Sequence, residues 1–288
     1  MGKHAYLIMA HSNFAQLQKL ISVLDDKRND IYVHVDKKSV GFREEEFKTE
    51  HSSLVFVPRI AVFGGGRSCM DCELRLLKAA AYRRSYDYYH LISGQDLPIK
   101  SQDEIHSFFK KNEGKSFLDF AQEENENQSF LDRVQYWYPF QDFIGTNRDD
   151  LARRLDWLQN ILLMLQKKLR YSRIKEREYK YYKGRNWFSI TDGLARYVLA
   201  KEEALIEEYR FTLGADEIFL HTLAMNSHFC DQIVKKSMRL MVFEGNKPYV
   251  FRKKDFKYLM GSEALFARKF QDSVDEAIIN RIVKRIRL

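Results

Sequence analysis

The sequence is poor in residues that break or loosen a chain. It has four prolines and 13 glycines among 288 residues. It contains no linker rich in Ser, Gly and Pro, and no internal repeat. Its 45% hydrophobic and 14% aromatic residues are enough to fill a sizeable core, which excludes bulk disorder. We therefore predict one compact domain over residues 1–288.

The chain also lacks a run of about 18 apolar residues, the length that a membrane-spanning helix needs. Its N-terminus shows no charged and apolar segments of a signal peptide. Only three cysteines occur, Cys69, Cys72 and Cys230, which is typical of a reducing compartment. Cys69 and Cys72 have the spacing of half a zinc site or of a redox pair, but no second Cys/His pair accompanies them. These absences predict a cytoplasmic protein.

Two nucleotide-binding signatures are missing as well. The turn after the first predicted strand reads Ala10-His11-Ser12-Asn13 and has none of the glycines of a dinucleotide-binding G-x-G-x-x-G turn. No Walker P-loop occurs. The sequence therefore disfavours an NAD enzyme and excludes a P-loop kinase or ATPase.

Positive charge is concentrated in one segment. Residues 151–185 hold eleven Lys and Arg against three acidic residues, which accounts for the whole net charge of +8. Trp157 and several leucines lie in the same segment. Such a segment fits a helix packed on the domain with a solvated basic face, or a contact with an anionic membrane surface. Nucleic acid binding is the least favoured interpretation.

Strands and helices alternate in the first part of the chain. The periodicity predicts strands at 5–9, 31–35, 54–58 and 88–92, with helices at 13–24 and 68–85. This order implies a mostly parallel sheet with helices on its faces, an α/β fold. Later segments are less regular: we expect strands at 116–120 and 187–190, and helices at 195–199 and 216–224.

The most informative stretch runs from Tyr88 to Lys100. Its apolar residues end at Ser93, and Gly94 then permits an unusual backbone angle in a sharp turn. Short polar side chains follow at such a strand end, where open α/β sheets bind ligands. An ordinary exit from a strand into a solvated loop is the alternative.

Six segments together resemble one family. Ser93-Gly94-Gln95-Asp96-Leu97-Pro98-Ile99-Lys100 is similar to the signature of the core-2/I-branching β-1,6-N-acetylglucosaminyltransferases (glycosyltransferase family 14), which are inverting sugar transferases. The other matches follow the family's order at residues 4–11, 32–38, 186–191, 216–219 and 265–270. Eukaryotic members carry a membrane anchor and several disulfides, so this chain resembles a bacterial-type member.

The resemblance implies a single GT-A domain, with a Rossmann-like sheet that binds a nucleotide sugar. Its nucleotide-binding half would cover about 1–115, and its acceptor-binding and catalytic half about 116–288. The chain lacks Asp-x-Asp, the motif that holds a divalent metal in many GT-A enzymes. The family instead uses an Arg and a Lys to hold the diphosphate, and these correspond to Arg252 and Lys269. We expect neither a divalent metal nor a cofactor.

The same resemblance makes Glu217 the general base. Asp216 and Glu217 precede an apolar run, and Asp216 looks like the cap of a helix that begins there. A carboxylate in an apolar first turn can acquire a raised pKa. The two acids could instead simply complement the helix dipole.

Further site residues follow from the resemblance with less support from the sequence. Donor contacts are expected from Asp36, His11, Arg67 and Ser68. Acceptor contacts are expected from Glu123, Tyr138, Trp187 and Asp96.

Together these features predict a metal-independent, inverting glycosyltransferase that transfers N-acetylglucosamine from its UDP-sugar to a glycan. UDP-xylose is the nearest alternative donor. The acceptor could be lipid-linked, with residues 151–185 touching the inner face of the membrane. A non-catalytic membrane-binding or polyanion-binding protein on the same fold is the second hypothesis.

Overall fold

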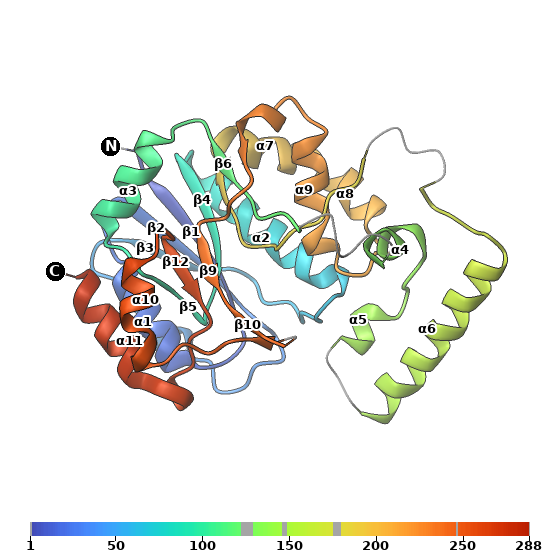
Figure 1. Cartoon of the computed structure of the whole chain (residues 1–288), viewed down its shortest axis with the longest axis horizontal. Coiled ribbons are helices and arrows are strands. Elements are labelled where there is room, and N and C mark those ends of the chain that lie inside the picture. Colours follow the sequence, from blue (N-terminus) through green and yellow to red (C-terminus); the bar gives the residue numbers. More distant parts are fainter. Residues whose placement is uncertain (1, 122–128, 146–148, 175–179, 246, 288) are drawn as a thin grey trace.

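A sheet of seven strands forms the centre of the structure (Figure 1), a computed structural model that describes residues 2–121, 129–145, 149–174, 180–245 and 247–287. The strands are β1 (His4–Ala10), β2 (Asn29–Val35), β3 (Ser53–Phe56), β4 (Tyr88–Ser93), β6 (Ser116–Phe117), β7 (Ser189–Thr191) and β8 (Ile233–Val234). Their order is β3-β2-β1-β4-β7-β6-β8, and only β7 pairs antiparallel with its neighbours. The predicted mostly parallel α/β sheet is confirmed.

Helices cover both faces of this sheet. Alternate side chains of β1 enter two separate cores: Ala5 and Leu7 pack into one, and Tyr6 and Ile8 into the other. The first core lies under α2 (Arg67–Arg83), α7 (Asp192–Ala200) and α9 (Phe219–Met225). The second lies under α1 (Phe14–Leu24), α3 (Gln102–Lys111) and α11 (Asp272–Ile286).

A second, smaller sheet lies beside the central one. It consists of β5 (Asp96–Pro98), β12 (Phe266–Arg268) and β9 (Arg239–Met241), in that order. A two-stranded hairpin, β10 (Phe243–Glu244) with β11 (Lys247–Pro248), follows β9. The other helices are α4 (Ser129–Gln135), α5 (Gln141–Ile144), α6 (Asp150–Lys168), α8 (Glu202–Glu208) and α10 (Phe256–Gly261). Short 3₁₀ turns are η1 (Glu44–Glu46), η2 (Ala215–Glu217), η3 (Cys230–Gln232) and η4 (Lys253–Asp255).

The predicted strands and helices of the first part of the chain all form. The backbone expected at Gly94 and two later elements need correction. The strand expected at 116–120 is only β6, although the N–H of Leu118 still donates to the carbonyl of Val234 at 3.1 Å. The helix expected at 216–224 is the turn η2 followed by α9, so Asp216 caps no helix. Gly94 does not adopt a positive φ. A Cβ there would lie 3.2 Å from the Cβ of Ala10, so Gly94 allows a close approach of β4 to β1.

The structure also bears on Cys69 and Cys72, on metal binding and on membrane-spanning helices. Cys69 and Cys72 are buried in α2, and burial raises the pKa of both thiols. In the described part of the chain, no three His, Cys, Asp or Glu side chains are placed to share a metal ion. Nor do the described helices include one that is long and apolar enough to span a membrane.

The topology gathers polar residues at one edge of the central sheet. β1, β2 and β4 are parallel, so their carboxyl ends meet at this edge, followed by His11, Asp36 and Gly94. β7 runs the other way, and its first residue, Ser189, pairs with His90 of β4. The segment before β7 therefore also lies at the carboxyl edge, where open α/β sheets bind ligands.

Candidate active site

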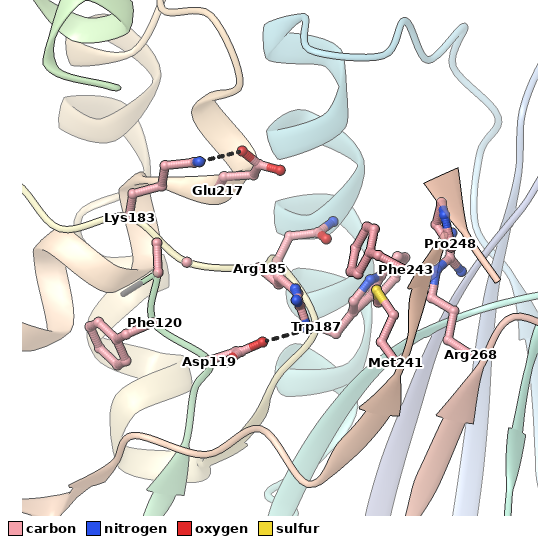
Figure 2. A pocket seen from close by; sticks show the side chains of 13 residues that line it. Asp119, Phe120, Lys183, Arg185, Trp187, Glu217, Met241, Phe243, Pro248 and Arg268 are labelled. Carbon is pink, nitrogen blue, oxygen red and sulfur yellow. Dashed lines mark ion pairs between the residues drawn. The ribbon is translucent and has the colours of Figure 1, made fainter. Parts of the chain in front are cut away.

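A cavity of about 720 Å³ opens at this edge. Figure 2 shows its walls: residues 119–121 after β6, residues 183–187 before β7, and Glu217 form one side. The opposite side comes from the small sheet and the hairpin. Its residues are Met241, Phe243, Pro248 and Arg268.

Two cations hold the carboxylate of Glu217. Its Oε2 accepts a hydrogen bond of 2.9 Å from Nη1 of Arg133 and lies 3.9 Å from Nζ of Lys183. The Glu217 side chain keeps 38% of its surface exposed and lines the cavity. Oε1 makes no hydrogen bond with any described residue, so one carboxylate oxygen is available to a ligand.

Gly184 makes this arrangement possible. Its N–H donates to the carbonyl of Glu217 at 2.9 Å, which ties residues 183–187 to the turn η2. A Cβ on Gly184 would lie 1.7 Å from the carbonyl oxygen of Asp119 and 2.5 Å from Nε2 of His221. No other residue fits there without moving the backbone.

Two buried carboxyl groups lie behind Glu217. Oδ1 of Asp216 and Oε2 of Glu73 are buried with no hydrogen-bond partner among the described residues. Burial, with the neighbouring Glu217, raises the pKa of Asp216 to about 7. Burial, with the neighbouring Asp216, raises the pKa of Glu73 well above its usual range. The amide of Asn186, a residue that lines the cavity, donates to Glu73 at 2.9 Å and so links these acids to the cavity wall.

Arg268 forms the opposite wall. Its guanidinium pairs with Asp96 at 2.9 Å, donates to the hydroxyl of Ser93, and lies 4.7 Å from the centroid of the Trp187 ring. Asp96 is only 1% exposed and also accepts from the N–H and hydroxyl of Ser93. The turn after β4 is therefore a buried support that orients Arg268 against Trp187.

More positive charge lies next to Arg268. Partial burial, then Lys269 and Arg268, lower the pKa of His11. Burial and the adjacent Arg268 lower the pKa of Lys269. Asp36 accepts from the backbone and the ammonium of Lys38. Lys269, Arg268 and Lys38 all lie near enough to His11 to lower its pKa. Arg268 pairs with Asp96 and Lys38 with Asp36, whereas Lys269 makes no ion pair with any described residue, which favours an anionic ligand beside it.

The site therefore presents a carboxylate at one side and clustered cations at the other. A carboxylate with a free oxygen can remove a proton from a hydroxyl group. Fixed cations can stabilise the negative charge of a departing diphosphate. A planar aromatic side chain between them, Trp187, offers a surface for the apolar face of a sugar.

The sequence as a whole matches one family model, described as the Core-2/I-Branching enzyme, over residues 4–259. That match covers most of the 288 residues. The chain belongs to the Core-2/I-Branching enzyme family.

The chain is similar in sequence to several xylosyltransferases. Xylosyltransferase 2 of Homo sapiens is 23% identical over 305 residues, which cover 96% of this chain and 32% of the relative. Xylosyltransferase of Ciona intestinalis is 22% identical, with 96% of this chain and 33% of the relative covered. The chain thus spans about a third of the length of these relatives. Among solved structures, mouse xyloside xylosyltransferase 1 in its apo form has a TM-score of 0.39 and 10% identity, covering 93% of this chain and 97% of that one.

The structure brings several of the predicted site residues together. Glu217 and Trp187 line the cavity. His11 and Lys269 lie in the adjoining cationic cluster, and Asp36 lies close enough to affect the pKa of His11. Asp36 is nearly buried, and Lys38 and the backbone of residue 62 occupy its oxygens.

Other predicted residues lie elsewhere. Arg252 is exposed at the start of η4 and does not line the cavity, because Phe251 before it turns inward to the core. Tyr138 is buried, and burial raises its pKa to about 12; it too lies outside the cavity wall. Asp96 supports Arg268 and has no surface with which to contact an acceptor. Glu123 lies outside the described residues.

Arg67 and Ser68, at the start of α2, both contact other residues of the protein. Arg67 pairs with Asp71 at 3.2 Å within α2. The hydroxyl of Ser68 donates to Asp142 at 2.7 Å and accepts from the N–H of Phe63. Both groups are therefore engaged by the protein, and their predicted contacts with a donor stay a prediction.

Sequence reasoning missed the three basic residues of the cavity wall, Lys183, Arg185 and Arg268. Arg268 stands beside the predicted Lys269, and Lys183 and Arg185 stand within the basic segment. Arg185 pairs with Asp119 at 3.2 Å and lies over the ring of Phe243 (Figure 2). Lys183 and Arg185 flank Gly184 directly before the predicted strand at 187–190, and this pattern could have indicated that they lie at the edge of the sheet.

We predict that Asp216→Asn changes the dependence of stability on pH. Burial and the neighbouring Glu217 raise the pKa of Asp216 from 3.8 to about 7 in the folded chain, so the unfolded chain releases this proton at a lower pH than the folded chain does. The free energy of unfolding of the wild type should then fall as pH rises from about 4 to 7, by up to about 4 kcal/mol from this group. Asp216→Asn should remove that loss, which urea unfolding at several pH values would measure.

A control for this experiment is Asp231→Asn, at an exposed carboxylate. It should follow the wild type at every pH. If Asp216→Asn also followed the wild type, Asp216 would not hold a proton in the folded chain.

Proposed function

We propose that the chain is a metal-independent, inverting glycosyltransferase that transfers a sugar from a UDP-sugar to a hydroxyl group of a glycan. One observation carries this proposal. Glu217 and Arg268 line opposite sides of one cavity at the carboxyl edge of the sheet (Figure 2). Lys269 follows Arg268 in the chain, and both residues lower the pKa of His11. Membership of the Core-2/I-Branching enzyme family supports it.

In this proposal, the free oxygen of Glu217 takes the proton of the acceptor hydroxyl. The acceptor oxygen forms a bond to the anomeric carbon while the bond from that carbon to the diphosphate oxygen breaks. UDP leaves with the electron pair toward Arg268 and Lys269, on the side opposite Glu217. Attack from the opposite side inverts the configuration at the anomeric carbon, which gives a β-linkage from an α-linked donor.

Two donors deserve a direct comparison. The resemblance to the N-acetylglucosaminyltransferases favours UDP-N-acetylglucosamine, whereas the relatives that cover 96% of the chain are named xylosyltransferases. We take UDP-xylose as the first donor to test, and the N-acetylglucosamine donor as the second. A single added group on the sugar changes binding by about 1–3 kcal/mol, so a pairwise comparison will separate them.

We propose metal independence because side chains of the protein can supply the positive charge that the diphosphate needs. The sequence has no Asp-x-Asp, and fixed cations beside Arg268 can supply the positive charge that a metal supplies elsewhere. Burial lowers the pKa of His11 and of Lys269, and the repulsion of nearby cations lowers both further. A diphosphate bound between them would relieve this repulsion, which supports an anion site made by side chains.

The proposal predicts that UDP and one UDP-sugar stabilise the protein against heat in the presence of EDTA. Ligand at a hundred times its Kd adds about 2.7 kcal/mol, or several degrees in Tm at about 2–4 °C per kcal/mol. UDP-xylose, UDP-N-acetylglucosamine, UDP and ADP would be compared by thermal unfolding. A shift that appears only after manganese is added would contradict a metal-free site, and no shift with any nucleotide would contradict the donor site itself.

A further inference from the structure

Helix α6 lies at the periphery of the molecule, away from the central sheet (Figure 1). Its buried residues are Ala152, Gln159 and Gln166, spaced seven apart along one stripe of the helix. The glutamines make amide hydrogen bonds to the protein: Gln166 accepts from the N–H of Trp137 at 2.9 Å and donates to its carbonyl at 3.2 Å. A polar stripe thus attaches this helix to the protein.

Six apolar residues in or just after α6 are exposed, whereas Leu155, Ile161, Leu162 and Leu163 are half-buried. Trp157 is 64% exposed, Met164 62%, and Leu169 just after the helix 77%. This is the reverse of a surface helix in a globular protein, whose apolar stripe packs on the core. We call this the outer face of α6. It consists of Leu151, Trp157, Leu158, Met164, Leu165 and Leu169.

Cations border the outer face. Arg154, Lys168 and Arg170 are exposed and make no ion pair with any described residue. Arg153 pairs with Asp150, and these two with Arg154 and Trp157 surround a shallow hollow. Apolar and aromatic side chains flanked by Lys and Arg match the composition of helices that lie in the interface of anionic membranes.

We propose that the outer face of α6 docks on an anionic lipid surface. Trp157 and the leucines would enter the boundary between headgroups and acyl chains, and Arg154 and Lys168 would lie against lipid phosphates. A second copy of the chain is a poorer occupant, because a twofold contact through the same face would bring these unpaired cations together. The inference goes beyond the proposed transferase activity and does not depend on it.

Binding to lipid vesicles tests the proposal with the full chain. We expect the protein to sediment with vesicles of phosphatidylcholine mixed with phosphatidylglycerol and to bind vesicles of phosphatidylcholine alone at least about tenfold more weakly. Trp157→Asp should reduce binding to the mixed vesicles by at least about tenfold. Its matched control is Tyr82→Asp, because Tyr82 is similarly exposed, at 69%, but lies on α2.

A second pair of variants tests the charges. Arg153→Glu with Arg154→Glu should weaken binding to the mixed vesicles at least about tenfold. Lys110→Glu with Lys111→Glu, at exposed positions on α3 across the molecule (Figure 1), should change it less than threefold. Equal losses in both double variants would mean that general positive charge, and not α6, binds the vesicles.

Two further results would overturn the proposal. One is the absence of binding to either kind of vesicle. The other is a dimer in size-exclusion chromatography with light scattering that Trp157→Asp dissociates, since the outer face would then be covered by a second copy. Donor stabilisation by UDP should be unchanged in all four variants, so a failure of lipid binding is distinguishable from a failure of the proposed activity.

Discussion

Replacing Glu217 by Gln should lower kcat at least about 100-fold, roughly the least that is lost with a general base. The amide keeps the size of the side chain but cannot accept the proton of the acceptor hydroxyl. The stabilisation of the protein by UDP should stay within error of the wild type, because the predicted diphosphate contacts lie across the cavity at Arg268 and Lys269. Initial rates with saturating donor, together with thermal shifts, measure both effects.

The matched control is Glu207→Gln. Glu207 is 78% exposed and lies 3.9 Å from Arg210, so this change also removes a carboxylate from an ion pair, but away from the cavity. It should leave kcat within about twofold of the wild type. A non-catalytic membrane-binding or polyanion-binding protein on the same fold predicts a different result: Glu217→Gln would leave the function intact, and high salt would abolish it.

The central sheet could be predicted because its strands are strongly patterned. β1, β2 and β4 are six or seven residues long and almost entirely buried, so each reads as an apolar run bounded by polar turns. The small sheet could not be predicted. Its strands β5, β9 and β12 have three residues each, too few to show a period of two.

Some residues of the site could not be predicted from the sequence, because the direction of a side chain depends on tertiary packing. Arg252 and Arg268 are both basic residues beside buried aromatics. Only the structure shows that Arg268 meets Asp96 and Trp187 while Arg252 points to solvent. Asp216 failed as a helix cap for a similar reason: Gly214 adopts a left-handed conformation, and the turn η2 buries the carboxyl group instead.

The orientation of the basic segment 151–185 could not be predicted either. Its composition fits a helix packed on the domain with a solvated basic face, which implies that its apolar side is buried. In the structure, Gln159 and Gln166 occupy the packed side and Trp157 stays exposed. Gln159 and Gln166 hold this side of α6 against the protein through amide hydrogen bonds to the backbone. The periodicity of hydrophobic residues cannot predict such bonds.

Replacing Lys269 by Met should lower kcat/KM about 100-fold to 1,000-fold, the range found when one group that stabilises developing negative charge is removed. Methionine keeps much of the apolar stem and removes the ammonium. Lys269 is partly buried beside Arg268, and both effects lower its pKa. A departing diphosphate would therefore gain more from this cation than from a fully hydrated one. The rates would be measured in EDTA with the best donor.

Arg252→Met is the informative comparison, because the resemblance assigns Arg252 the same role and the structure places it in solvent. It should change kcat/KM less than about twofold. A large loss in Arg252→Met with little change in Lys269→Met would reverse the assignment and imply that η4 moves toward the cavity when the donor binds. If manganese restored the activity of Lys269→Met, a metal ion could replace the lost charge, and the positive charge would then be what the site requires at this position.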